Sequence, residues 1–442
     1  GSFTLDQVEV VCADEGLPAA DVAPVLVRLV EQSLVSSARL RFGLLETVRA
    51  FAAERLSEDA RTPLRARHAA DTADRVSRLS QQLAGPQEPG AVAAIATLGP
   101  DLHAAWSYAV QHDRPLAVGL AASIHGYAYT RQRRDLLEWG LTVSQWDIDH
   151  PRMPHALAVA AAAAWADGDL AEAATLATRG VAAAGGPDSP AAAVPLMQSA
   201  NLAMFAGRTG EAADLLRRVV DLHRAAGQEA TAVVEEVSVW QVRIYGGEAA
   251  ETAAALPELL HRLRARGNPS GLAWGHYVHG EAEATLGHVA DALAAYRAAD
   301  AEGSRSDNRL FVTLARSSSV ALMAQHGDPA EAAAEFQRVM TQWEDLGNQA
   351  AQWWVLGTLV ALLARTGRAE AAARLAGAVV TARHRYFQIP HIDAMLEQAT
   401  AAARAELGPA AYDAAYTQGA KLSFPAAVAY ARELVSRLPS AA

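Results

Sequence analysis

Glycine recurs along this chain at a nearly constant interval, and the repeat constrains the possible fold more than any other feature. The repeating positions are Gly168, Gly207, Gly247, Gly287, Gly327 and Gly367, and their period is about 40 residues, within the range of known repeat architectures. Similar text follows them, as in Gly168-Asp-Leu-Ala-Glu-Ala and Gly327-Asp-Pro-Ala-Glu-Ala. A fixed period of this length is typical of proteins in which each repeat is one supersecondary unit that packs on its neighbours.

The text around each glycine predicts a helical hairpin. A glycine just past a helix can adopt the left-handed conformation that closes the helix. An acidic residue in the next first turn, such as Asp169 or Asp328, meets the positive end of the helix dipole. The small residue five positions after the glycine lets the two helices approach closely. The larger residue four positions further on fills the space behind, as at Leu216, Leu256, Tyr296 and Phe336.

Two repeat classes compete for this pattern. A period near 40 is closer to HEAT repeats, whereas glycine followed by alanine and then an aromatic residue resembles the tetratricopeptide (TPR) pattern. Because loop length changes at little cost, we give the local text more weight. We expect an all-α fold: a TPR-like superhelix of lengthened helical hairpins over residues 150–383.

Composition supports a helical protein and narrows its partners. Alanine supplies 103 of the 442 residues, and alanine is the best intrinsic helix former. The net charge of −11 argues against nucleic acid as a partner, because such binding depends on neutralising phosphates with Lys and Arg. The single cysteine, Cys12, excludes an intrachain disulfide and a cysteine zinc site. The longest apolar runs are shorter than the ~18 residues of a membrane helix, so we expect a cytoplasmic protein without membrane contact.

No enzyme motif is visible in the sequence. The only lysine, Lys421, is not in a Walker A loop, so the chain contains no P-loop site for a nucleotide. There is no G-x-S-x-G nucleophile elbow, G-x-G-x-x-G loop or convincing carboxylate pair. His276 and His279 lie three positions apart, but no third ligand follows at metal-site spacing. We therefore expect neither catalysis nor a metal or other cofactor in this chain.

Residues 3–56 have a different pattern from the repeats. They predict a helix over Val22–Leu34, a two-stranded wing from 33–35 and 40–45, and a helix over Thr47–Leu56. The text LVRLVEQSLV followed by RFGLLETVRAFAAERL resembles the winged-helix module that follows the ATPase core in STAND-type bacterial transcriptional regulators of the large LuxR-family and SARP-type class. Segments 101–109 and 407–429 resemble the entry to the sensor and its closing segment in the same family. The chain departs from the family at Gln132, where a turn glycine is expected.

The resemblance implies an order of nucleotide-binding core, winged helix and TPR-like sensor. The nucleotide-binding core of the same full-length protein is then a partner, and ATP is expected only in that missing core. The excess of arginine over lysine fits an actinobacterial-type genome, and Gly1-Ser2 resembles a protease scar. The winged helix is not expected to bind DNA, because residues 3–56 contain eight acidic residues and five arginines.

These features divide the chain into five predicted segments. They are a winged-helix module at 3–56, a helical connector at 57–98, atypical first hairpins at 99–149, TPR-like repeats at 150–383 and C-terminal capping helices at 384–442. The connector is interrupted at Gly85-Pro86-Gln87-Glu88-Pro89-Gly90, where we expect a hinge.

The first helix of each hairpin lines the concave face in a TPR-like array. Counting back roughly three, six, ten and thirteen positions from each glycine follows one face of this helix and selects the residues that line the groove. The selected candidates are His155, Trp165, Met197, Asn201, Met204, Gln241, Ile244, Trp274, Tyr277, Glu281 and Trp354. Aromatic and Met side chains with a few polar groups are typical of a ligand or peptide site, although each position can instead pack between repeats. Trp353 and Trp354 cannot both face the groove.

Two functions remain open from the sequence. In the first, the groove binds a small-molecule effector and acts as the sensor of a transcriptional regulator, changing its coupling to the ATPase and DNA-binding parts. In the second, the groove is a protein-interaction scaffold that binds a peptide or mediates self-association.

Overall fold

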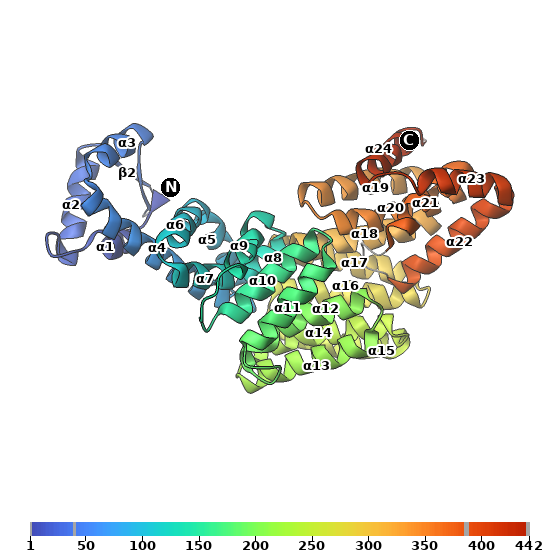
Figure 1. The fold of residues 1–442 in the computed structure, drawn as a ribbon, viewed down its shortest axis with the longest axis horizontal. Coiled ribbons are helices and arrows are strands. Elements are labelled where there is room, and N and C mark those ends of the chain that lie inside the picture. The colour runs from blue at the N-terminus through green and yellow to red at the C-terminus, as the bar shows by residue number, and fades with distance from the viewer. Residues whose placement is uncertain (1, 39–40, 384–388, 439–442) are drawn as a thin grey trace. The chain divides into compact units, whose positions relative to one another are not determined.

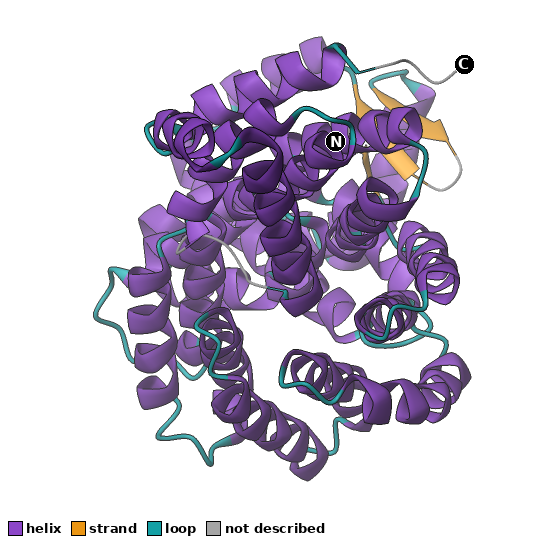
Figure 2. Cartoon of the chain, turned by 90° about the vertical axis from the view of Figure 1, so that its right-hand side faces the viewer, coloured by secondary structure: helices purple, strands orange, loops and turns teal. Residues whose placement is uncertain are grey.

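The computed structural model describes residues 2–38, 41–383 and 389–438. Over these residues the chain forms helices α1 to α24, and its strands are β1 to β3 (Figure 1, Figure 2). This result confirms the all-α prediction, which the alanine content favours. Within the same ranges, no helix has both the length and the apolar character needed to cross a membrane.

The chain divides into two compact units. Unit 1 comprises Gly1–Gln82 with Gly90–Ile124, and unit 2 comprises Leu83–Pro89 with His125–Ala442. The elements of unit 1 are β1 (Ser2–Phe3), α1 (Leu5–Cys12), α2 (Ala19–Glu31), β2 (Val35–Ala38), β3 (Arg41–Leu44), α3 (Glu46–Arg55), α4 (Glu58–Gln81), α5 (Glu88–Thr97), α6 (Gly99–His112) and α7 (Arg114–Ser123), with the first two residues of α5 counted in unit 2.

The strands of unit 1 form one antiparallel sheet in the order β1-β3-β2. Val35 lies opposite Leu44, and Ser2 lies opposite Gly43. Of the predicted wing, β3 lies within 40–45, whereas β2 shares only Val35 with the predicted strand 33–35, because the chain turns at Ser33, with φ 60°, before the strand begins. Leu40 lies outside the described residues. The sequence pattern does not predict β1, because two residues carry no readable alternation. The identification of this module as a winged helix stays a prediction.

Exposed large apolar side chains gather in the same module. Seven of the eight such side chains of the described chain lie between Val10 and Leu56. Leu45 is 63% exposed and Phe51 is 55% exposed. Apolar surface concentrated in this way is typical of a region that contacts another protein.

Unit 2 is a series of helical hairpins. After α8 (His125–Arg131) and α9 (Arg134–Ser144), six pairs follow: α10 (Met153–Ala166) with α11 (Leu170–Ala183), α12 (Ala193–Phe205) with α13 (Thr209–Ala225), α14 (Glu229–Tyr245) with α15 (Ala249–Arg266), α16 (Pro269–Thr285) with α17 (Val289–Ser304), α18 (Arg309–His326) with α19 (Pro329–Asp345), and α20 (Gln349–Arg365) with α21 (Ala369–Thr381). The chain ends with α22 (Pro390–Leu407), α23 (Pro409–Gly419) and α24 (Phe424–Ser436). The predicted boundary between residues 383 and 384 borders a stretch outside the described residues.

The repeated glycine closes the first helix of the pair in five of the six hairpins. The φ angles at these five positions lie between 69° and 96°, in the left-handed region. Gly327 differs, with φ −89° and ψ −174°, although Asp328 caps the next helix directly after it just as Asp169 does after Gly168. Gln132 has φ 52° and stands at the turn between α8 and α9, where the sequence pattern calls for glycine.

The small residue five positions after each glycine is buried, as expected for a close approach of two helices. Its exposure is 1% at Ala173 and 0% at Ala212 and Thr252. The larger residue four positions further on is equally buried, for example Tyr296 and Phe336 at 1% each. The TPR-like hairpin pattern is therefore confirmed down to individual side chains.

The segment Gly85–Gly90 is packed within unit 2 as far as Pro89, so it is not an open linker, and its role as a hinge stays a prediction. The Glu88 side chain is 1% exposed. Its carboxylate accepts hydrogen bonds from the Arg131 guanidinium at 2.7 Å, the Asn268 amide at 2.8 Å, and the Ser270 backbone N–H at 2.9 Å and hydroxyl. We call Glu88, Arg131, Asn268 and Ser270 the Glu88 cluster. The donors lie up to 182 residues away in the chain, so the sequence does not reveal them.

Buried asparagines begin three successive hairpins at Asn268, Asn308 and Asn348, in step with the glycine repeat. Each Oδ1 accepts a hydrogen bond from the backbone N–H three positions on, at 2.6, 3.1 and 3.0 Å respectively. Each Nδ2 donates to another element, as from Asn348 to Gln132 at 3.2 Å. One side chain thus caps its own helix and ties that helix to its neighbours.

Candidate functional site

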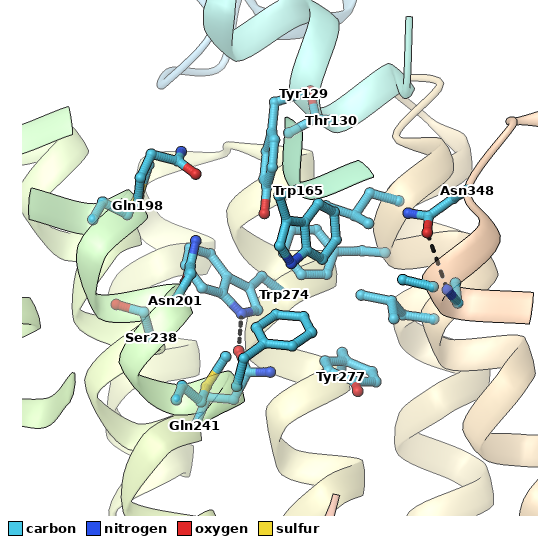
Figure 3. Close-up of a pocket in the computed structure, with 18 of the residues that line it drawn as sticks. Tyr129, Thr130, Trp165, Gln198, Asn201, Ser238, Gln241, Trp274, Tyr277 and Asn348 are labelled. Carbon is cyan, nitrogen blue, oxygen red and sulfur yellow. Dashed lines mark hydrogen bonds between the residues drawn. The ribbon is translucent and has the colours of Figure 1, made fainter. Parts of the chain in front are cut away.

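A cavity of about 270 Å³ lies within unit 2, where the first helices of the hairpins converge (Figure 3). Each first helix from α8 to α20 contributes to its wall, in the sequence α8, α10, α12, α14, α16, α18 and α20. The aromatic residues of the wall are Tyr129, Trp165, Phe205, Trp274, Tyr277, Phe311, Trp343 and Trp354. A concave, largely apolar cavity with a few polar groups is the usual form of a small-molecule site.

The aromatic side chains of the wall pack on one another. The ring centroids of Trp165 and Phe205 are 5.5 Å apart in an edge-to-face arrangement, and those of Trp274 and Phe311 are 5.2 Å apart and stacked. The stacked rings of His125 and Tyr129 are 5.8 Å apart. Packing of this kind fixes the side chains before any ligand arrives, which reduces the entropy lost on binding.

A chain of hydrogen bonds leads from the pocket wall into the core. The Trp274 indole N–H donates to Gln241 Oε1 at 2.9 Å (Figure 3). Gln241 Nε2 in turn donates to the Tyr245 hydroxyl at 3.2 Å. The Tyr245 hydroxyl lies 3.4 Å from Glu281. The Tyr296 hydroxyl also donates to Glu281, at 2.7 Å. These contacts fix the orientation of Trp274 and Gln241 on the wall.

The structure brings most of the groove candidates together. Eight of the eleven line the cavity: Trp165, Met197, Asn201, Met204, Gln241, Trp274, Tyr277 and Trp354. Trp353, the neighbour of Trp354, instead packs against Phe424 with ring centroids 5.2 Å apart. The structure thus places these eight candidates around one cavity, and their role in binding stays a prediction.

The other three candidates lie elsewhere. Ile244 is 1% exposed and packs in the core, although Trp165 and Met204, at the same distance before their glycines, line the cavity. Glu281 is 0% exposed and lies beneath the wall, with its carboxylate bonded to tyrosine and serine hydroxyls. His155 is half-buried at the start of α10 and is not part of the cavity wall.

Burial changes the ionisation of several groups in this region. It lowers the pKa of His125 to about 4, and it does the same at His155. Burial raises the pKa of Tyr129 to about 12, with a smaller contribution from the charge of Glu235. Burial alone raises the pKa of the Glu235 carboxyl to about 7. At neutral pH both imidazoles are therefore uncharged, and Glu235 is close to its midpoint.

Three polar atoms of the wall have no hydrogen-bond partner among the described residues. They are the indole nitrogens of Trp165 and Trp354 and Oε2 of Glu235, all buried. Because buried polar atoms are nearly always paired, this set points to groups that a ligand satisfies.

Sequence reasoning missed Glu235, Tyr129 and Phe311 on this wall. Tyr129 lies three positions before Gln132, so the counting rule finds it once Gln132 is treated as a turn position. Phe311 lies more than four helical turns before Gly327, beyond the reach of the rule, because α18 is longer than a standard TPR helix. Glu235 lies between two counted positions, and the sequence carries no signal for it.

Outside the cavity, Glu283, His288 and Asp291 bring possible metal-ligand atoms within 4.8 Å of one another. His288 is hydrogen-bonded to Glu283 at 2.7 Å, and His279 lies 3.4 Å from the same carboxylate. Their contacts with one another already account for this arrangement, and we assign no ion to it.

No protein-family model and no curated protein matches the chain. Among solved structures, the chain is similar to a signal transduction ATPase with numerous domains (STAND) that has a tetratricopeptide repeat sensor, from Pyrococcus horikoshii, with 12% identity and a TM-score of 0.49. That match covers 98% of this chain, which spans 63% of the length of the STAND protein. A Rap protein complexed with competence and sporulation factor matches 83% of this chain over 97% of its own, with 12% identity and a TM-score of 0.46. Because both TM-scores are below 0.5, we infer a function from the pocket itself.

Proposed function

We propose that unit 2 is the ligand-binding sensor of a regulatory protein and that its cavity binds a small molecule. The observation that carries this proposal is an apolar cavity whose wall has three polar atoms, on Trp165, Trp354 and Glu235, without a hydrogen-bond partner in the described part of the chain. An empty cavity with polar atoms left unpaired costs stability, and a ligand that pairs with them recovers that stability. The size of about 270 Å³ suits a small ligand better than a peptide, whose contacts extend beyond one cavity.

The wall suggests how binding is transmitted. Its residues come from successive hairpins, so a ligand in the cavity contacts several repeats at once. A solenoid in which each repeat touches only its neighbours changes curvature through small shifts between repeats. The ligand favours one curvature only to the extent that it binds that state more tightly.

The exposed apolar side chains between Val10 and Leu56 support a second part of the proposal. We assign them to contact with a nucleotide-binding core, as the resemblance to STAND-type regulators implies, in a protein that controls transcription. Leu45→Ser and Phe51→Ser are expected to weaken binding of that core, supplied as a separate fragment, without lowering the melting temperature of this chain. If both variants bind the core with unchanged affinity, this assignment is wrong.

A thermal-shift screen tests the sensor proposal. A compound at 100 times its Kd stabilises the protein by about 2.7 kcal/mol, which is readily measured. Trp274→Ala removes part of the wall and is expected to abolish the shift. The matched control is Trp240→Ala, because Trp240 packs under Arg243 and is not part of the cavity wall. If no compound in a broad metabolite library gives a shift that depends on Trp274, the sensor proposal fails.

A further inference from the structure

Two neighbouring carboxylates on α14 have opposite environments. Glu236 is paired with Arg262 at 2.7 Å and with Arg224 at 3.2 Å. Glu235 lies on the cavity wall, and its Oε2 is buried without a hydrogen-bond partner among the described residues. Among the described residues, positively charged side chains thus pair with Glu236, and none pairs with Oε2 of Glu235.

The groups around Glu235 do not replace that charge. The described residues of the cavity wall include no Lys or Arg. The imidazole of His125, on the same wall, is uncharged at neutral pH, because burial lowers its pKa to about 4. Tyr129 interacts electrostatically with Glu235, but it stays neutral below its raised pKa of about 12. A counter-ion for the ionised form of Glu235 therefore comes from outside the described wall.

The rest of the wall suits a cation with an apolar body. The π-faces of Trp165, Trp274 and Tyr129 carry partial negative charge and attract ammonium groups. The net charge of −11 favours the approach of a cation over that of an anion. A buried carboxylate beside aromatic rings also disfavours a carboxylate or phosphate ligand by direct repulsion.

We infer that the ligand of this cavity carries a protonated amine on an aromatic or aliphatic body of small size, and that Glu235 is its counter-ion. The inference rests on the proposed function, because it specifies the chemical class that the same cavity selects. The ammonium group donates to Oε2 of Glu235, and the apolar body packs against the aromatic wall.

The experiment compares amines with alcohols of the same shape. Tryptamine and tryptophol, and phenethylamine and 2-phenylethanol, differ only in an ammonium or hydroxyl group at the end of one side chain. Isothermal titration calorimetry on the full chain is expected to show that each amine binds at least about tenfold more tightly than its alcohol. In Glu235→Gln this preference is expected to disappear. Glu236→Gln is the matched control, because it changes the adjacent carboxylate outside the cavity and leaves the preference intact.

Proton release gives a second readout that needs no variant. Near pH 7 Glu235 is partly protonated, and an ammonium group at its side favours the ionised form. Titrations in buffers of different ionisation enthalpy are expected to show release of about half a proton when an amine binds at pH 7. The alcohols release none.

The outcomes separate this inference from the proposed function. If alcohols or other neutral compounds bind in a Trp274-dependent way and amines bind no better, Glu235 is not a counter-ion, although the sensor proposal stands. The same conclusion follows if the amine preference survives in Glu235→Gln. If neither the probes nor a broad library binds, both the sensor proposal and this inference are overturned.

Discussion

Replacing Glu88 with glutamine removes the charge on which the Glu88 cluster converges. The side chains of Glu88 and Arg131 are 1% and 2% exposed, and the carboxylate accepts four hydrogen bonds. In Glu88→Gln one acceptor oxygen becomes an N–H₂ group that faces donors, and the buried guanidinium keeps its charge without a counter-ion. Breaking a buried ion pair on one side costs about 3–5 kcal/mol. For a unit of about 325 residues this corresponds to a fall in melting temperature of about 4–7 °C.

Chemical denaturation followed by tryptophan fluorescence measures this effect, because eight of the nine tryptophans lie in unit 2. Asp214→Asn is the matched control: its pair with Arg217 has a similar length, 2.8 Å, but the side chains are 72% and 61% exposed. The control is expected to cost less than about 1 kcal/mol. A double variant, Glu88→Gln with Arg131→Met, is expected to lose less than the sum of its single changes. If Glu88→Gln costs no more than Asp214→Asn, the cluster does not hold this segment.

Three further predictions concern packing, acid stability and capping. In urea denaturation, Gly419→Ala is expected to destabilise the protein by several kcal/mol, because the new Cβ would overlap the Arg374 carbonyl of α21. Gly210→Ala is the control, because its Cβ on α13 would meet open space, and it is expected to be neutral or stabilising by up to about 1 kcal/mol. Burial lowers the pKa of His125 from 6.5 to about 4, so the contribution of this group to stability is complete above pH 6.5 and is lost as pH falls towards 4. His125→Gln is expected to flatten the pH dependence of the melting temperature between these two values. An unchanged profile would contradict the assignment. Asn348→Ala is expected to lower the free energy of unfolding by about 1–3 kcal/mol, because it removes a helix cap and a buried hydrogen bond to Gln132. A change within about ±0.5 kcal/mol in the same urea titration would refute this reasoning.

The hairpins could be predicted because their signals are local. A glycine that closes one helix and the small residue that begins the next close contact lie near each other in the chain, and both act through short-range geometry. The Asn268, Asn308 and Asn348 series has the same period and could have been read by the same method. It escapes notice because asparagine is common at loop positions and its burial is not visible in a sequence.

The cavity could be predicted only in part. Counting back from the glycines finds Trp165, Asn201 and Trp274, because the rule follows helix periodicity on the first helix of each pair. The same rule selects Ile244, although this side chain turns into the core, since small rotations of a helix move the edge of its groove face. Glu235 has no sequence signal, because only its tertiary surroundings distinguish it from Glu236.

The boundary between the two units is crossed three times by the chain, after Gln82, after Pro89 and after Ile124. A fragment that begins at His125 therefore lacks residues 83–89, and with them the carboxylate that Arg131, Asn268 and Ser270 require. A truncation at His125 would therefore follow a unit boundary and still remove part of a buried hydrogen-bond cluster of unit 2. A synthetic heptapeptide of residues 83–89, added in trans, is the natural complement for such a fragment.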